Sequence, residues 1–116
     1  MKAILFCGCL VFPLSLCLSF AGGKTLKYKD VKPIFAKSCL PCHSGSKPAH
    51  GLNLTTYQSI LKGDGEGPVI KKKSSRKSRL ARVLHGSPQL MPPGGELPPA
   101  SIQKIERWID AGALEK

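Results

Sequence analysis

Apolar residues recur at the three- and four-residue spacing of a helix in several short parts of the chain. Residues 28–38 place Val31 and Phe35 on one face. A second pattern begins at Pro99, which suits a first helical turn, and ends at Gly112, which suits a helix end. We therefore expect a helix near each end of the region that follows the N-terminal segment.

Two shorter helices are predicted between these. Thr55 is expected to be an N-cap, because Gln58 three residues later completes a capping box and Gly63 ends the helix. The other covers residues 78–84, where leucine and valine recur at helical spacing.

Proline and glycine interrupt the segments that join these helices. Residues 40–54 are expected to form an irregular loop, residues 63–68 a flexible turn, and residues 85–99 a loop stiffened by proline. No alternating strand pattern of useful length is present. The prediction is an all-α domain of three to four short helices, which buries less apolar surface than a stable domain needs.

The first 21 residues have the pattern of a secretory signal peptide. A single cation, Lys2, precedes an uncharged apolar run, and Ser19 and Ala21 supply small residues before Gly22. We expect cleavage after Ala21, which leaves residues 22–116 as one exported domain in the periplasm. An uncleaved apolar run would instead hold the domain at the periplasmic side of a membrane.

Two cysteines, Cys39 and Cys42, remain after this cleavage, and His43 follows them directly. A C-x-x-C-H sequence in an exported chain is the pattern for covalent haem attachment. The two thiols would form thioethers with the haem vinyl groups, and the imidazole of His43 would bind the iron on its proximal side. The haem would also supply the apolar bulk that the short chain lacks.

Three other interpretations of the cysteine pair were considered. A thiol redox pair would need a preceding strand and a βαβ context, and a disulfide over so short a span would stabilise little. A zinc site would require Cys39, Cys42, His50 and His85, with spacings that resemble no regular finger and with His43 unused. The haem interpretation is favoured over all three.

Met91 is the expected second axial ligand of the iron. It lies in a loop that Pro92 and Pro93 stiffen, which is a way to hold a thioether against iron. The alternative is that Met91 fills an apolar gap. His50 and His85 are weaker candidates for the ligand, and Met1 would leave with the signal peptide.

The chain is strongly basic, with a formal net charge of +11, and seven of its cations lie within twelve residues. They are Lys71, Lys72, Lys73, Arg76, Lys77, Arg79 and Arg82. Such a cluster favours an acidic partner, an anionic membrane or nucleic acid. Export and the lack of interleaved aromatic residues argue against nucleic acid. The tract is either a solvated mobile loop or, from Lys71 to Arg79, a docking surface for an acidic redox partner.

Taken in order, four stretches resemble a class I c-type cytochrome, closest to the short planctomycete-type cytochrome c domains. They are VKPIFAKSCLPCH, GLNLTTYQSILKG, SRLARVLHGSPQLMPPGG and IQKIERWIDAGA, between Val31 and Leu114. The resemblance implies an all-α fold around one haem c, in which the first and last helices cross and Phe35 packs near Trp108.

The expected function is one-electron transfer and not an enzymatic reaction. With His43 and Met91 both on the iron, no position is left for a substrate. If Met91 did not bind, a haem-based sensor or weak peroxidase would be the alternative. The candidate haem wall consists of Phe35, Leu54, Leu80, Leu84, Leu90, Ile105, Trp108 and Ile109.

Overall fold

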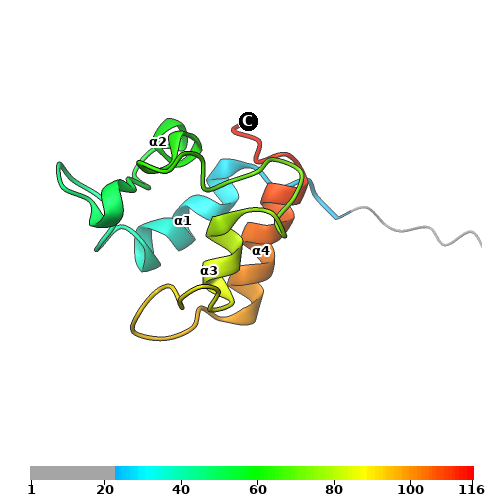
Figure 1. Ribbon diagram of the computed structural model, residues 1–116. Coiled ribbons are helices and arrows are strands. Elements are labelled where there is room, and N and C mark those ends of the chain that lie inside the picture. The colour runs from blue at the N-terminus through cyan, green and yellow to red at the C-terminus, as the bar shows by residue number, and fades with distance from the viewer. Residues whose placement is uncertain (1–22) are drawn as a thin grey trace, which may run out of the picture.

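The computed structural model describes residues 23–116, so the expected signal peptide lies outside the described residues. It contains four helices, α1 (Tyr28–Ser38), α2 (Tyr57–Lys62), α3 (Arg79–Leu84) and α4 (Pro99–Asp110), and a 3₁₀ turn at Ala49–Gly51 (Figure 1). Residues 23–116 form no strand, only an isolated bridge between Asp64 and Gly67. The predicted all-α class is therefore confirmed.

The helix ends agree with the sequence patterns except at the start of α2. Thr56, and not Thr55, is the N-cap, and its Oγ1 accepts a hydrogen bond from the backbone N–H of Ser59 at 3.1 Å. The N–H of Thr55 donates instead to Oδ1 of Asn53 at 2.9 Å. Because Asn53 holds Thr55 in this turn, the helix begins one residue later than predicted.

Helices α1 and α4 pack against each other, and α3 packs on α4 (Figure 1). The rings of Phe35 and Trp108 meet edge to face, with their centroids 6.1 Å apart. Val31, one turn before Phe35, has no exposed surface. The expected crossing of the first and last helices, with Phe35 beside Trp108, is thus present.

The apolar core lies between Val31 and Ala113 in the sequence. Within residues 23–116, it draws on all four helices and on the segments between them. Its buried members are Val31, Phe35, Leu54, Ile60, Val69, Ile70, Leu80, Ala81, Leu84, Leu97, Ile102, Ile105, Trp108, Ile109 and Ala113. None of the helices in residues 23–116 is long and apolar enough to cross a membrane.

The end of the chain is fastened to the other elements by hydrogen bonds. The carbonyl oxygen of Leu114 accepts from the backbone N–H of Tyr28 at 2.8 Å and from Nε1 of Trp108 at 2.9 Å. The hydroxyl of Tyr57 donates to the carbonyl oxygen of Ala113 at 2.8 Å. These bonds join α1, α2 and the segment after α4.

The turn at residues 63–67, which we expected to be flexible, is held in place. Gly63 has a φ of 81°, and a Cβ at this position would lie 2.1 Å from the carbonyl oxygen of Gly67. Only glycine fits such a close approach. Across the turn, the guanidinium of Arg79 donates to both carboxylate oxygens of Asp64, at 2.9 and 3.0 Å.

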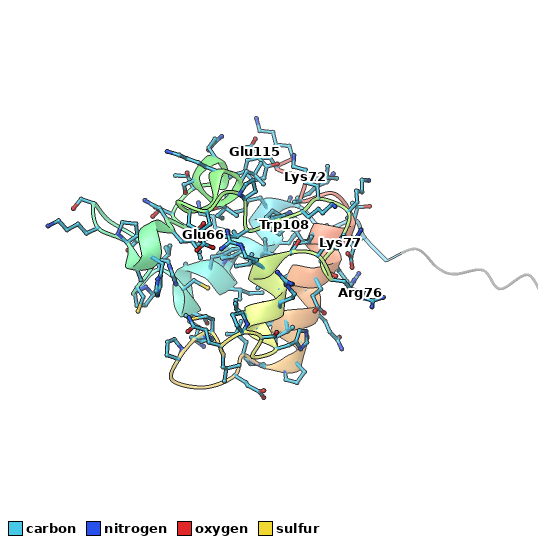
Figure 2. All side chains as sticks on the ribbon, in the orientation of Figure 1. Glu66, Lys72, Arg76, Lys77, Trp108 and Glu115 are labelled. Carbon is cyan, nitrogen blue, oxygen red and sulfur yellow. The ribbon has the colours of Figure 1, made fainter. Side chains whose placement is uncertain are left out.

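The basic loop, residues 71–78, is also ordered by specific contacts. The buried Ser78 hydroxyl accepts from the N–H of Lys71 at 2.8 Å and donates to the carbonyl oxygen of Ser74 at 2.8 Å. Asp110 accepts from the backbone N–H of Ser75 at 2.7 Å and from its hydroxyl at 3.0 Å. The loop therefore lies fixed beside the end of α4, with its lysine and arginine side chains at the surface (Figure 2).

Candidate functional site

A cavity of about 810 Å³ brings together all four residues that the sequence assigned to the haem. Its lining includes Cys39, Cys42, His43 and Met91. The two cysteines and the histidine follow the end of α1, and Met91 comes from the loop between α3 and α4. A cavity of this volume is within the usual range for a small-molecule or cofactor site.

The inner walls of the cavity are apolar. Of the predicted wall residues, Leu54, Leu80 and Leu84 line it. Phe35, Ile105, Trp108 and Ile109 belong to the buried core behind the wall, and half-buried Leu90 does not line the cavity. Val69 and Leu52 line the cavity but were not predicted. Val69 could have been predicted, because the apolar pair Val69-Ile70 follows directly after the turn.

The imidazole ring of His43 is oriented by a backbone carbonyl. Nδ1 of His43 lies 3.1 Å from the carbonyl oxygen of Leu52. Because a carbonyl can only accept, Nδ1 must carry the proton, which leaves the lone pair of Nε2 free for a metal. The backbone N–H of His43 also donates to the carbonyl oxygen of Cys39 at 2.9 Å, so main chain and ring are both fixed.

The two cysteines are free thiols at the wall of the cavity. Burial raises the pKa of the Cys39 thiol to about 11, so this thiol is protonated at neutral pH. A thiol redox pair requires the opposite shift, because the thiolate is the reactive form. The raised pKa of Cys39 therefore argues against a thiol redox pair.

Met91 is anchored to α3 through its main chain. Its backbone N–H donates to the carbonyl oxygen of Val83 at 2.8 Å. The side chain is half-buried and contributes a thioether to the cavity wall, where Pro92 and Pro93 continue the lining. The proline-stiffened loop predicted from the sequence thus carries Met91 to the same cavity as His43.

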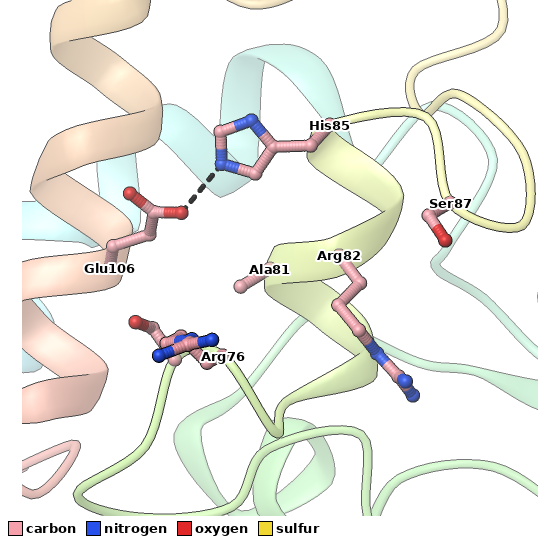
Figure 3. Close-up of a pocket in the computed structure, with 7 residues that line it drawn as sticks. Arg76, Ala81, Arg82, His85, Ser87 and Glu106 are labelled. Carbon is pink, nitrogen blue, oxygen red and sulfur yellow. Dashed lines mark hydrogen bonds and ion pairs between the residues drawn. The ribbon is translucent and has the colours of Figure 1, made fainter.

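The alternative histidine ligands differ in position. His50 lines the cavity, although its side chain is exposed to solvent. His85 lies outside it, in a shallow depression between α3 and α4, where its Nε2 is 2.6 Å from Oε1 of Glu106 (Figure 3). Met1 falls outside the described residues.

The donor set of the cavity fits a haem better than a bare metal ion. Residues 23–116 contain no cluster of three or more histidine, cysteine or acidic side chains placed to hold an ion. A haem needs two thiols, an imidazole with a free nitrogen, a second soft ligand and apolar walls. Cys39, Cys42, His43 and Met91 supply the first three requirements, and the leucine and valine side chains supply the fourth, the apolar walls.

One edge of the cavity is charged. Asp64, Glu66, Arg79 and Arg82 line it. Arg79 forms ion pairs with Asp64 and Glu66, at 2.9 and 3.3 Å, and its hydrogen bond holds the pKa of the Asp64 carboxyl below its usual range. Arg82 is exposed and takes part in no ion pair of the described chain.

The planctomycete cytochrome C family matches residues 39–95 of this chain. The match begins at Cys39, includes His43 and Met91, and covers the lining of the cavity except Ser38. No curated protein and no solved structure gives a significant match. Together with the all-α fold, the family match supports a planctomycete-type cytochrome c domain, which is a haem-binding domain.

Proposed function

We propose that this protein is an exported cytochrome that carries single electrons on one covalently bound haem c. Cys39 and Cys42 would form the thioether bonds, and His43 and Met91 would bind the iron. The observation that carries the proposal is the meeting of these four side chains in one apolar cavity, with Nδ1 of His43 already occupied by Leu52. Bound haem iron supplies a one-electron couple at this place.

The protein's own groups determine how that couple would behave. The Leu52 carbonyl fixes the His43 ring and raises the basicity of its other nitrogen. A thioether at Met91 favours ferrous iron and so raises the reduction potential. Leu54, Leu80 and Leu84 exclude water from the inner cavity. With His43 and Met91 both bound to the iron, no substrate could bind the metal. Electrons would then enter and leave through the open side of the cavity.

An electron donor or acceptor would approach the open side of the cavity. Of the seven clustered cations, Arg79 and Arg82 line the cavity, and Arg82 is the exposed one of the two. A positive charge at this position favours the approach of an acidic partner protein, because opposite charges increase the rate of encounter. Export of the protein rests on the leader pattern of residues 1–21.

The experiment compares the wild type with Met91→Ala and His50→Ala, each expressed with a haem-attachment system. The ferric wild type should show the weak far-red band of sulfur ligation and bind cyanide slowly. Met91→Ala should lose the band, bind cyanide much faster and have a lower reduction potential. His50→Ala, the control from the same cavity, should leave all three unchanged.

Two results would contradict this proposal. A high-spin wild type with fast cyanide binding would favour the alternative, a haem-based sensor or weak peroxidase. If His50→Ala altered the spectrum and Met91→Ala did not, His50 would be the ligand. Covalent attachment is tested with one further variant, Cys39→Ser/Cys42→Ser. A haem stain should remain on the denatured wild type and should be absent from this variant.

A further inference from the structure

Five of the seven clustered cations lie apart from the cavity. Arg79 and Arg82 line the cavity, whereas none of the other five does. We call these five the loop cations: Lys71, Lys72, Lys73, Arg76 and Lys77. All five are exposed, and none takes part in the ion pairs found among residues 23–116.

The loop cations lie beside the last turns of α4. The backbone N–H of Lys73 donates to the carbonyl oxygen of Ile109 at 3.0 Å, and Asp110 holds Ser75. Figure 2 shows Lys72, Arg76 and Lys77 on this side of the molecule, while Glu66 of the cavity rim lies toward the other side. A partner seated on the loop cations would therefore not cover the open side of the cavity.

The start of the described chain lies on the same side of the molecule as the loop cations. Gly23 is next to Arg107 of α4, where a Cβ on the glycine would meet Nη2 at 3.0 Å. Figure 1 shows the segment that precedes α1 and the basic loop on the same flank of α4. The sequence that precedes residue 23 contains an uncharged run from Ala3 to Leu18. A membrane that held this run would therefore be tethered to the side of the domain where the loop cations lie.

We propose that the loop cations bind the anionic headgroups of a phospholipid membrane and so turn the open side of the cavity toward the aqueous compartment. The surface has the required charge, its backbone is fixed by Ser78 and Asp110, and the chain enters it from an apolar segment. Each cation near an anionic surface increases affinity roughly fivefold. The surface acts whether or not the leader is cleaved, because its charges belong to the folded domain.

The test uses holo-protein that begins at Gly22, exported behind a cleavable host leader, so that the apolar run cannot cause binding. This protein keeps every residue of the apolar core described above, and the haem spectrum checks that each variant is folded. The loop variant is Lys71→Gln/Lys72→Gln/Arg76→Gln/Lys77→Gln. Lys73 is retained because its side chain packs against Gly112. The control variant removes four exposed lysines elsewhere, as Lys32→Gln/Lys37→Gln/Lys47→Gln/Lys62→Gln.

Binding is measured by flotation with vesicles of phosphatidylglycerol and phosphatidylcholine, and with phosphatidylcholine alone. The wild type should bind only the anionic vesicles and should be released at about 1 M salt, where screening is nearly complete. The loop variant should bind at least ~50-fold more weakly than the wild type, whereas the control variant should bind within about fivefold of it.

Equal losses in the two variants would show a dependence on net charge alone and would overturn the proposal. So would wild-type binding that does not distinguish the two kinds of vesicle. If the loop variant bound vesicles normally but exchanged electrons more slowly with an acidic blue-copper protein used as a probe, the loop cations would be a docking surface for a redox partner. None of these results depends on whether Met91 binds iron, so the electron-carrier proposal can fail separately.

Discussion

Single side chains at two positions determine how the loops of this small domain are held. Ser78 has no exposed surface, and its hydroxyl joins both ends of the basic loop through Lys71 and Ser74. The carboxylate of Asp110, at the end of α4, holds the middle of the same loop by accepting two hydrogen bonds from Ser75. Neither residue belongs to a recognisable motif, since a serine before a helix suggests only an N-cap. The Ser78 side chain in fact bonds to the loop and does not cap α3.

Ser78→Ala should destabilise the holo-protein by about 1–3 kcal/mol, because the N–H of Lys71 and the carbonyl of Ser74 would be left without their buried partner. Chemical denaturation followed by tryptophan fluorescence measures the change. Ser46→Ala is the control, since Ser46 is exposed, and it should change stability by less than about 0.5 kcal/mol. Equal effects of the two substitutions would rule out the role given to Ser78.

The elements were largely predictable, but the contacts between them were not. The bounds of α1 and the ends of α4 follow from apolar periodicity, proline and glycine. The pairing of Arg79 with Asp64 could not be predicted, because it joins residues 15 positions apart across a turn. For the same reason, sequence reasoning placed Arg79 on an exposed docking surface, whereas the structure uses its charge within the fold.

The ion pair between Asp64 and Arg79 should make the attachment of the turn to α3 dependent on pH. Its hydrogen bond lowers the pKa of Asp64 in the folded protein, so the stabilisation is present above the unfolded carboxyl value of about 3.9 and is lost as pH falls through the folded value. Arg79→Gln should therefore cost about 1 kcal/mol at pH 7 and progressively less in acid.

Denaturation curves between about pH 3 and pH 7 would measure this difference between the wild type and Arg79→Gln. Arg76→Gln supplies the control, since Arg76 is exposed and lacks an ion pair in the described chain. A cost for Arg79→Gln that stayed constant down to the lowest pH would show that Asp64 is not its relevant partner.

At the scale of the whole molecule, the protein combines a packed half with a half built around a cavity. The α1–α4 contact contains Val31, Phe35 and Trp108, none of which lines the cavity. Much of the cavity lining comes instead from loops, within residues 39–54 and 87–93. Cys39, Cys42, His43 and Met91, which the structure brings to one cavity, could be selected from the sequence because a C-x-x-C-H motif and a methionine in a proline-rich loop are local patterns. The Leu52 carbonyl on His43 could not, because any backbone carbonyl could have served.

Cys39→Ser/Cys42→Ser, which cannot attach haem, should retain α1–α4 packing longer than it retains order around the cavity. Amide hydrogen exchange should rise first in residues 40–54 and 87–93, and later in α1 and α4. The fully attached wild type is the reference for each amide. Uniform loss of protection, with α1 and α4 exchanging as fast as the loops, would show that the haem is needed for the helix packing as well.

The hydrogen bonds from Tyr28 and Trp108 to Leu114 also determine how this domain tolerates being joined to other molecules. They hold the first and last described segments side by side, and no residue from 94 to 116 lines the cavity. A reporter fused after Lys116, or a resin coupled there, would begin away from the cavity wall. Several copies joined in tandem through such tethers would each keep the joint away from the cavity lining.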